Sequence, residues 1–180
     1  MLTAATLSGC AAGVPPGSAG EPSAPAKLDV IFVATDLTIV NAMLTLAGVT
    51  RDDIVYDLGC GDGRIVIAAA KEFGARGVGV DLDPQRIREA QANAARAGVA
   101  DRVTFRVQDI FDTDIQPATV VTLFLSPELN ERLRPKLTSQ LKPGSRIVSH
   151  RYGIGDWMPE RTVTLSVRET RNHIFLWRVP

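Results

Sequence analysis

A glycine-rich turn flanked by carboxylates is the part of this sequence best suited to chemistry. Residues 55–64 read VYDLGCGDGR, in which the glycines are Gly59, Gly61 and Gly63 and the aspartates are Asp57 and Asp62. Glycine tolerates positive φ in a tight turn and lets a ligand lie against bare backbone. A dinucleotide site would space its glycines as G-x-G-x-x-G and offer helix amides to a pyrophosphate. Because two carboxylates would repel a pyrophosphate, the turn favours a ligand with cationic groups.

The elements around this turn predict a strand–turn–helix unit. A β-branched run predicts a strand over 54–58, and an apolar helical pattern follows over 64–73. A second buried strand, 77–81, ends at Asp81, which lies 24 residues after Asp57. In doubly wound folds an acidic residue at about this offset, roughly 20 positions, binds the ribose hydroxyls of a nucleotide. One carboxylate can accept hydrogen bonds from both hydroxyls.

The pattern D-x-G-x-G-x-G resembles motif I of the class I S-adenosylmethionine (SAM)-dependent methyltransferases, and residues 57–63 match every fixed position. The resemblance implies SAM as the cofactor. It places the ribose on Asp81, the adenine amine on an acidic residue just after the third strand, and the methionine end near Thr35. The cofactor-binding residues implied in this way are Thr35, Asp57, Gly59, Cys60, Gly61, Gly63, Asp81, Leu82, Asp109 and Ile110.

Two of these positions leave alternatives open. Asp112 and Asp114 compete with Asp109 for the adenine amine, because all three follow the same predicted strand. Cys60 is expected to serve as a small side chain that fits the turn rather than as a nucleophile.

The remaining sequence predicts an α/β fold. Near-continuous apolar runs are typical of strands in a parallel sheet, and glycines stand where helices should stop. Further helices are expected over 37–47, capped by Thr35, over 84–97, and through 133–141, where Pro135 should break or bend the chain. Further strands are expected over 103–107, 120–125 and 145–150, followed by an antiparallel hairpin of 162–167 and 173–179. Residues 27–180 are therefore predicted to form a Rossmann-like, doubly wound seven-strand sheet with a C-terminal antiparallel hairpin, the topology of class I methyltransferases.

Several stretches are similar to one group within that class. Residues 32–35 (FVAT), 56–59 (YDLG), 64–66 (RIV) and 125–127 (LSP) resemble the small protein-lysine methyltransferases of mitochondrial inner-membrane proteins and their bacterial relatives. That group is in turn similar to the Dot1-type histone lysine enzymes. Its members usually carry Tyr-Val-Pro-Thr-Pro where this chain has Phe32, Ala34 and Asp36 around Thr35. The resemblance implies methyl transfer to a protein lysine amine.

Candidate catalytic residues follow the predicted strand 120–125. Ser126 and Asn130 are expected to line the acceptor side, although an ordinary helix start with Ser126 as its cap explains them equally well. His150 could act as a base or be hydrogen-bonded structure. Methyl transfer depends largely on positioning the nucleophile, so the lack of a catalytic triad is no objection. No His, Cys, Asp or Glu cluster has metal-ligand spacing.

Length and charge narrow the remaining possibilities. The 180 residues suit one domain, and 20 basic residues balance 20 acidic ones, so nothing indicates a nucleic-acid footprint. The expected partner is a protein or small-molecule methyl acceptor. A small-molecule methyltransferase and a non-catalytic SAM-binding protein are the alternatives, and the glycine spacing disfavours a nicotinamide-dependent reductase.

Residues 1–26 are predicted to be a disordered tail, since Ala, Gly, Pro and Ser dominate from 11 to 26. Residues 7–10 (LSGC) resemble the lipobox of bacterial lipoproteins, in which the cysteine, here Cys10, carries the lipid. No Lys or Arg precedes this segment, although a secretory signal needs a positively charged start. The chain is thus expected to be either cytoplasmic or anchored to a membrane through Cys10.

Overall fold

The computed structural model describes residues 35–180, in which helices and strands alternate along the chain. In chain order the elements are α1 Leu37–Leu46, β1 Ile54–Leu58, α2 Arg64–Phe73, β2 Arg76–Asp81, α3 Pro84–Ala97, β3 Val103–Val107, β4 Val120–Leu123, α4 Pro127–Gln140, β5 Arg146–His150, β6 Arg161–Val167 and β7 Thr170–Arg178. The predicted tail, Cys10 and the first residues of the predicted domain lie outside the described residues. The tail, the lipid anchor and the cellular location therefore stay predictions.

All seven strands form one sheet in the order β3-β2-β1-β4-β5-β7-β6. Strands β3, β2, β1, β4 and β5 run parallel to one another, whereas β7 runs antiparallel between β5 and β6. This arrangement confirms the predicted doubly wound sheet with a C-terminal hairpin. The strand order reverses between β1 and β4, and a crevice outside the carboxyl ends of the strands at such a point is where doubly wound sheets bind ligands.

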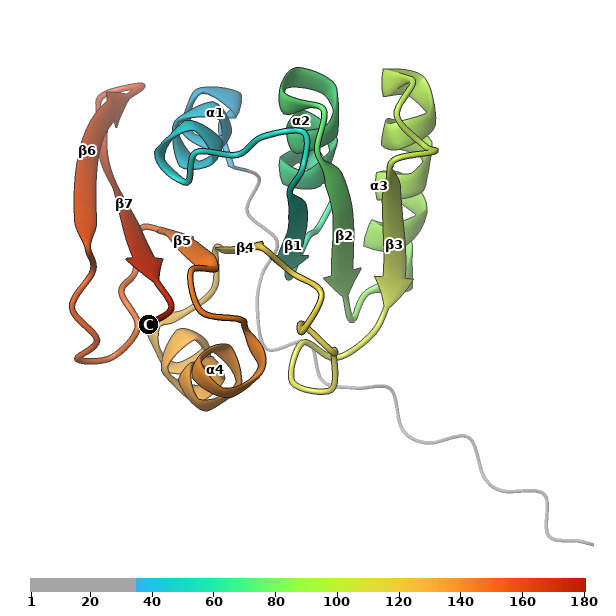
Figure 1. The fold of residues 1–180 in the computed structure, drawn as a ribbon. Helices are drawn as coiled ribbons and strands as arrows, with labels where there is room; N and C mark the ends of the chain where they lie inside the picture. Colours follow the sequence, from blue (N-terminus) through green and yellow to red (C-terminus); the bar gives the residue numbers. More distant parts are fainter. Residues whose placement is uncertain (1–34) are drawn as a thin grey trace, which may run out of the picture.

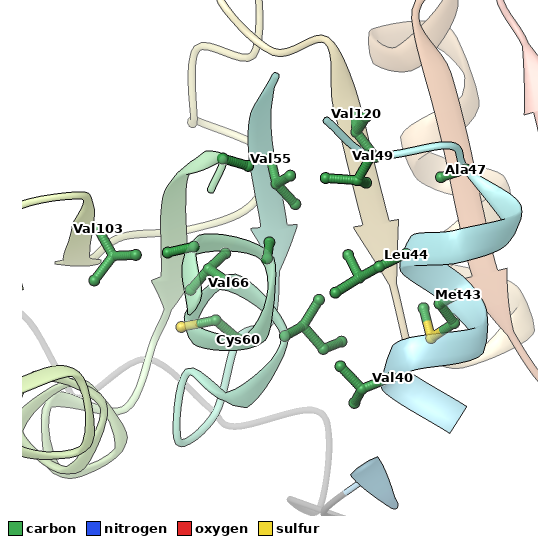
Figure 2. Close-up of a cluster of buried hydrophobic side chains, with 14 of the residues drawn as sticks. Val40, Met43, Leu44, Ala47, Val49, Val55, Cys60, Val66, Val103 and Val120 are labelled. Atoms are coloured by element: carbon green, nitrogen blue, oxygen red, sulfur yellow. The ribbon is translucent and has the colours of Figure 1, made fainter. Parts of the chain in front are cut away.

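Helices cover both faces of the sheet, with α1, α2 and α3 on one side and α4 on the other (Figure 1). Successive side chains of a strand point to opposite faces. Val55 of β1 accordingly packs into the cluster with the first three helices, while Tyr56 packs into the cluster with α4. Figure 2 shows the first cluster, to which α1 contributes Val40 and Leu44 and α2 contributes Val66. Two apolar layers thus hold the sheet edge at which the chemistry-bearing residues gather.

Local sequence signals, such as caps and glycines, determine where most helices and strands begin and end. Two expectations about the helices need correction. Asp36, not Thr35, caps α1: its carboxylate accepts from the Thr38 amide at 2.9 Å. Of the two effects expected of Pro135, a break or a bend, the break does not occur, because α4 continues to Gln140. Both Pro135 and Glu131, whose carbonyl loses its helical partner, lie on the exposed side of this helix, so water can satisfy that carbonyl.

Candidate cofactor and acceptor site

A cavity of about 710 Å³ opens at the carboxyl ends of the parallel strands. One half is formed by residues that follow β1, β2 and β3, together with Thr35 and the start of α2. The other half is formed by residues that follow β4 and β5 and by the first turns of α4. The residues of the first half include Thr35, Asp57, Gly59, Cys60, Asp62, Asp81, Leu82, Asp109 and Ile110, and those of the second include Phe124, Leu125, Ser126, Pro127, Arg132, Arg151 and Tyr152.

The glycine turn connects β1 to α2 beneath this cavity. Gly59, Gly61 and Gly63 all have positive φ, of 85°, 52° and 78°, which only glycine adopts at little cost. Gly59 lines the cavity, whereas Gly61 and Gly63 do not. A Cβ on Gly63 would lie 2.6 Å from the Phe105 ring, so this glycine lets α2 approach the sheet. Of the three predicted glycine contacts, the structure brings only Gly59 to the cavity wall.

Asp57 is a buried carboxyl at the cavity wall. It is 3% exposed, and the Thr122 hydroxyl of β4 donates to its carboxylate at 2.6 Å. Burial raises the pKa of the Asp57 carboxyl to about 7; the bond from Thr122 lowers it, and nearby Asp81 raises it further. A carboxyl in this state gains a favourable partner when a cation enters the cavity.

Cys60 lines the same wall of the cavity, but its thiol is unreactive. Burial and the nearby carboxylates of Asp57 and Asp81 raise the pKa of the Cys60 thiol far above its usual range. A thiolate is the reactive form of cysteine, so this thiol is no nucleophile. The structure agrees with the predicted use of Cys60 as a small side chain that fits the turn.

Asp81 and Asp109 occupy the predicted nucleoside end of the cavity. The Asp81 carboxylate accepts from the Gly61 amide at 2.9 Å and from the Asp83 amide at 3.0 Å, so it also fastens the glycine turn. Asp109 accepts from the Phe111 amide at 2.8 Å. The apolar Leu82 and Ile110 follow these two carboxylates and line the cavity with them, whereas Asp112 and Asp114 do not. Of the three aspartates that follow β3, only Asp109 has the placement that the adenine role requires.

Sequence reasoning gave no role to Arg64, which connects Thr35 to the glycine turn. Its guanidinium donates to the Thr35 carbonyl at 2.6 Å and to both carboxylate oxygens of Asp62, at 2.9 and 2.5 Å. This pairing lowers the pKa of the Asp62 carboxyl against the effect of burial. The sequence analysis also gave no role to Thr122. Its signal was that it is the one polar residue in the apolar run of β4.

In the acceptor half, the two candidate catalytic residues are placed differently. Ser126 lines the cavity, and its Oγ also accepts from the Leu129 amide at 3.3 Å as the cap of α4. Asn130 is fully buried behind the wall and does not line the cavity. His150 is buried too: its Nε2 lies 3.0 Å from the Asn172 side-chain oxygen, and burial lowers its pKa. The structure therefore brings Ser126 to the cavity, but neither Asn130 nor His150.

Two features are absent from residues 35–180. Within this range no helix has the length and apolar character needed to cross a membrane. The same residues contain no group of three or more His, Cys, Asp or Glu side chains placed to hold a metal ion.

The fold and the site together define a class I SAM-dependent methyltransferase. A family model described as "ANTKMT methyltransferase domain" matches residues 57–161, and the chain belongs to this family. A protein-lysine N-methyltransferase of Saccharolobus islandicus is 46% identical over 149 residues, which cover 82% of this chain and 92% of that protein. The adenine nucleotide translocase lysine N-methyltransferase of Mus musculus is 34% identical, and the match covers 77% of this chain and 60% of that protein.

A solved structure is similar over nearly the same part of the chain. It is described as an RNA methyltransferase from Salinibacter ruber in complex with S-adenosyl-L-homocysteine. The two chains are 50% identical with a TM-score of 0.79, and the match covers 82% of this chain and 94% of that one. A relative this similar in complex with the demethylated cofactor supports the assignment of SAM to this chain.

The residues of the cavity fit SAM chemically. SAM carries a sulfonium and an ammonium group, which suit the buried carboxyl of Asp57, and ribose hydroxyls, which suit Asp81. Leu82 and Ile110 offer apolar surface against which an adenine ring can pack. When bound, SAM supplies a methyl group on an already activated sulfur. The protein must then hold the acceptor in line with that methyl group.

Replacing Asp81 with alanine should weaken SAM binding by about 1–3 kcal/mol, because charged hydrogen bonds to the ribose would be lost. The same change frees the Gly61 and Asp83 amides, so the turn should also loosen. Calorimetric titration with S-adenosylhomocysteine measures the change in affinity. Asp101→Ala, at an exposed site outside the cavity, is the matched control. Unchanged affinity in Asp81→Ala would remove this carboxylate from the ribose role.

Proposed function

We propose that this protein transfers the methyl group of SAM to the ε-amine of a lysine in a protein substrate. The observation that carries the proposal is the acceptor half of the cavity, where Phe124, Leu125 and Pro127 form an apolar wall next to the cofactor half. A lysine must be neutral to attack, and an apolar environment lowers its pKa. None of the described residues that line the cavity is a histidine, so deprotonation by desolvation suits this site.

In the proposed reaction the lysine nitrogen forms a bond to the methyl carbon as the bond from that carbon to sulfur breaks. S-adenosylhomocysteine leaves with the bonding electron pair, and the methylated amine releases its extra proton to solvent. Ser126 at the start of α4 lines the cavity, and we expect it to contact the incoming amine. We expect Tyr152 and Phe124, which also line the cavity, to enclose the methylene chain of the lysine.

The names of the relatives support a lysine acceptor, since the Saccharolobus islandicus and mouse proteins are both called lysine N-methyltransferases. The resemblance to Dot1-type histone lysine enzymes, drawn from the same stretches of sequence, is a further prediction in this direction. An RNA acceptor is the second candidate, because the solved relative from Salinibacter ruber carries that name. Arg132 and Arg151 at the acceptor side could meet phosphates, but the chain has no net positive charge.

One labelling experiment separates these acceptors. The full chain is incubated with methyl-tritiated SAM and a cell extract, and samples are then treated with protease or ribonuclease. We expect macromolecular label that protease removes and ribonuclease does not, with methyllysine recovered after acid hydrolysis. Asp57→Asn serves as the weakened control. Label on nucleotides would favour the RNA acceptor, label on low-mass products a small-molecule acceptor, and no label at all would overturn the proposal.

A further inference from the structure

A buried polar network joins α4 to the loop after β5, behind the acceptor wall. Asn130 projects from the first turn of α4 and is fully buried. Its amide nitrogen lies 3.3 Å from the Ser149 hydroxyl, 3.4 Å from the Tyr152 carbonyl and 3.1 Å from the Gly153 carbonyl. The Ser149 hydroxyl in turn donates to the Tyr152 carbonyl at 2.7 Å. Two side chains thus hold the backbone of one short loop.

The loop that is held in this way has an unusual backbone. Arg151 has a φ of 73°, which is uncommon for a residue other than glycine and costs about 1–3 kcal/mol. Such a conformation persists only where neighbouring contacts enforce it. The loop presents the side chains of Arg151 and Tyr152 to the cavity, where Ser126 and Pro127 of the α4 start also lie.

Stability alone does not explain a polar residue at this position. The buried face of α4 is otherwise apolar, with Leu129, Leu133 and Leu137. The Asn130 side-chain oxygen is buried without a hydrogen-bond partner among the described residues, and a buried unsatisfied group costs about 1–3 kcal/mol. A leucine, which has the same branching but no polar atoms, would avoid this cost. The amide therefore serves the arrangement of the loop rather than the stability of the core.

We propose that Asn130 is a positioning residue, which clamps residues 151–153 to the first turn of α4 and so fixes the acceptor wall of the cavity. The clamp sets how far Tyr152 stands from Ser126 and Pro127, and hence the width of the channel through which the acceptor arrives. The catalytic consequence of this assignment rests on the proposed function. The structural part does not, because the position of Tyr152 can be measured without any acceptor.

The test compares Asn130→Leu with Gln140→Leu. Gln140 lies at the far end of the same helix, where its side-chain oxygen accepts from the Ile115 amide at 3.3 Å, away from the cavity. Both variants lose a side-chain amide that bonds to a loop, but only the first touches the proposed clamp. The sequence contains two tyrosines, Tyr56 and Tyr152, so 3-fluorotyrosine labelling gives two fluorine resonances. Tyr152→Phe assigns them.

In Asn130→Leu we expect the Tyr152 resonance to shift or broaden and the Tyr56 resonance to stay. We expect S-adenosylhomocysteine affinity to change less than about twofold, and lysine methylation to fall between about 10-fold and 100-fold because the acceptor is misplaced. Gln140→Leu should change neither. An unmoved Tyr152 resonance in Asn130→Leu, or an equal shift in Gln140→Leu, overturns the proposal.

A second variant keeps the test decisive if Asn130→Leu disturbs the whole fold. Ser149→Ala removes the other side chain that holds the Tyr152 carbonyl, and it should move the Tyr152 resonance without moving that of Tyr56. If Ser149→Ala also leaves Tyr152 unmoved, no clamp exists. Absence of lysine methylation in the unmodified chain would overturn the proposed function alone, since the fluorine result does not depend on it.

Discussion

Replacing Asp57 with asparagine is expected to stabilise the fold and to weaken SAM binding in one step. The folded carboxyl has a pKa of about 7, whereas an unfolded aspartate titrates near 3.9. A raised pKa means that this group opposes folding increasingly as the pH rises from about 4 to about 7. Asparagine carries no such charge, and its carbonyl oxygen can still accept from the Thr122 hydroxyl.

The size of this effect follows from the shift. About three pKa units correspond to at most about 4 kcal/mol, so Asp57→Asn should raise the free energy of unfolding at pH 8 by about 1–4 kcal/mol. The gain should shrink toward zero below about pH 4, where the carboxyl is protonated in both the folded and the unfolded chain. Urea unfolding of the cofactor-free protein at several pH values measures it. A stability difference that is independent of pH would contradict the buried-carboxyl explanation.

The same variant should also lack the carboxylate that pairs with the positive charge of SAM. We expect its SAM affinity to fall at least about tenfold, since a charged hydrogen bond contributes about 1.5–3 kcal/mol. In the unmodified protein, SAM affinity should rise with pH up to about 7, because binding favours the ionised carboxylate. The ammonium group can donate a charged hydrogen bond to Asp57, whereas the sulfonium has no hydrogen to donate. S-adenosylhomocysteine keeps the ammonium group but lacks the sulfonium charge. Equal pH profiles for the two ligands would therefore place Asp57 at the ammonium group, and a weaker pH dependence for S-adenosylhomocysteine would place it near the sulfonium.

Replacing Gly63 with alanine is expected to destabilise the protein by about 2–5 kcal/mol. Part of this cost is the left-handed backbone, about 1–2 kcal/mol for a residue with a Cβ, since φ is 78°. The rest is overpacking, about 1–3 kcal/mol, because the new Cβ would lie 2.6 Å from the Phe105 ring and 2.8 Å from the Ala90 Cβ. Relief of this clash would push α2 away from the sheet and displace the turn that lines the cavity.

Gly98→Ala separates the two contributions. Gly98 ends α3 with a φ of 71°, and a Cβ there would meet nothing within 4 Å. This control therefore bears the backbone cost without the clash. Thermal and urea unfolding of both variants should place Gly63→Ala about 1–3 kcal/mol below Gly98→Ala. If the two variants are equally stable, the close approach of helix and sheet is not what requires glycine at position 63.

The sequence by itself determined the fold of the described part and its cofactor class. Hydrophobic periodicity marked the helices and strands, and the bounds of α2, α3, β1 and β3 are as predicted. Glycine, proline and cap positions encode such features locally, because each depends on the conformation of a few neighbouring residues. The resemblance of residues 57–63 to motif I implied SAM, because that motif is one continuous stretch of sequence.

Only the tertiary structure decided how the site is held together. The bond from Thr122 to Asp57 joins residues 65 positions apart, and the clamp from Asn130 reaches 23 positions to Gly153. Arg64 reaches 29 positions back to Thr35. No local spacing encodes such pairs, because they form only when the sheet order places β1 beside β4 and α4 against the loop after β5. For the same reason a candidate catalytic Asn130 proved to lie behind the wall: sequence spacing places a residue on an element, but packing decides which way it faces.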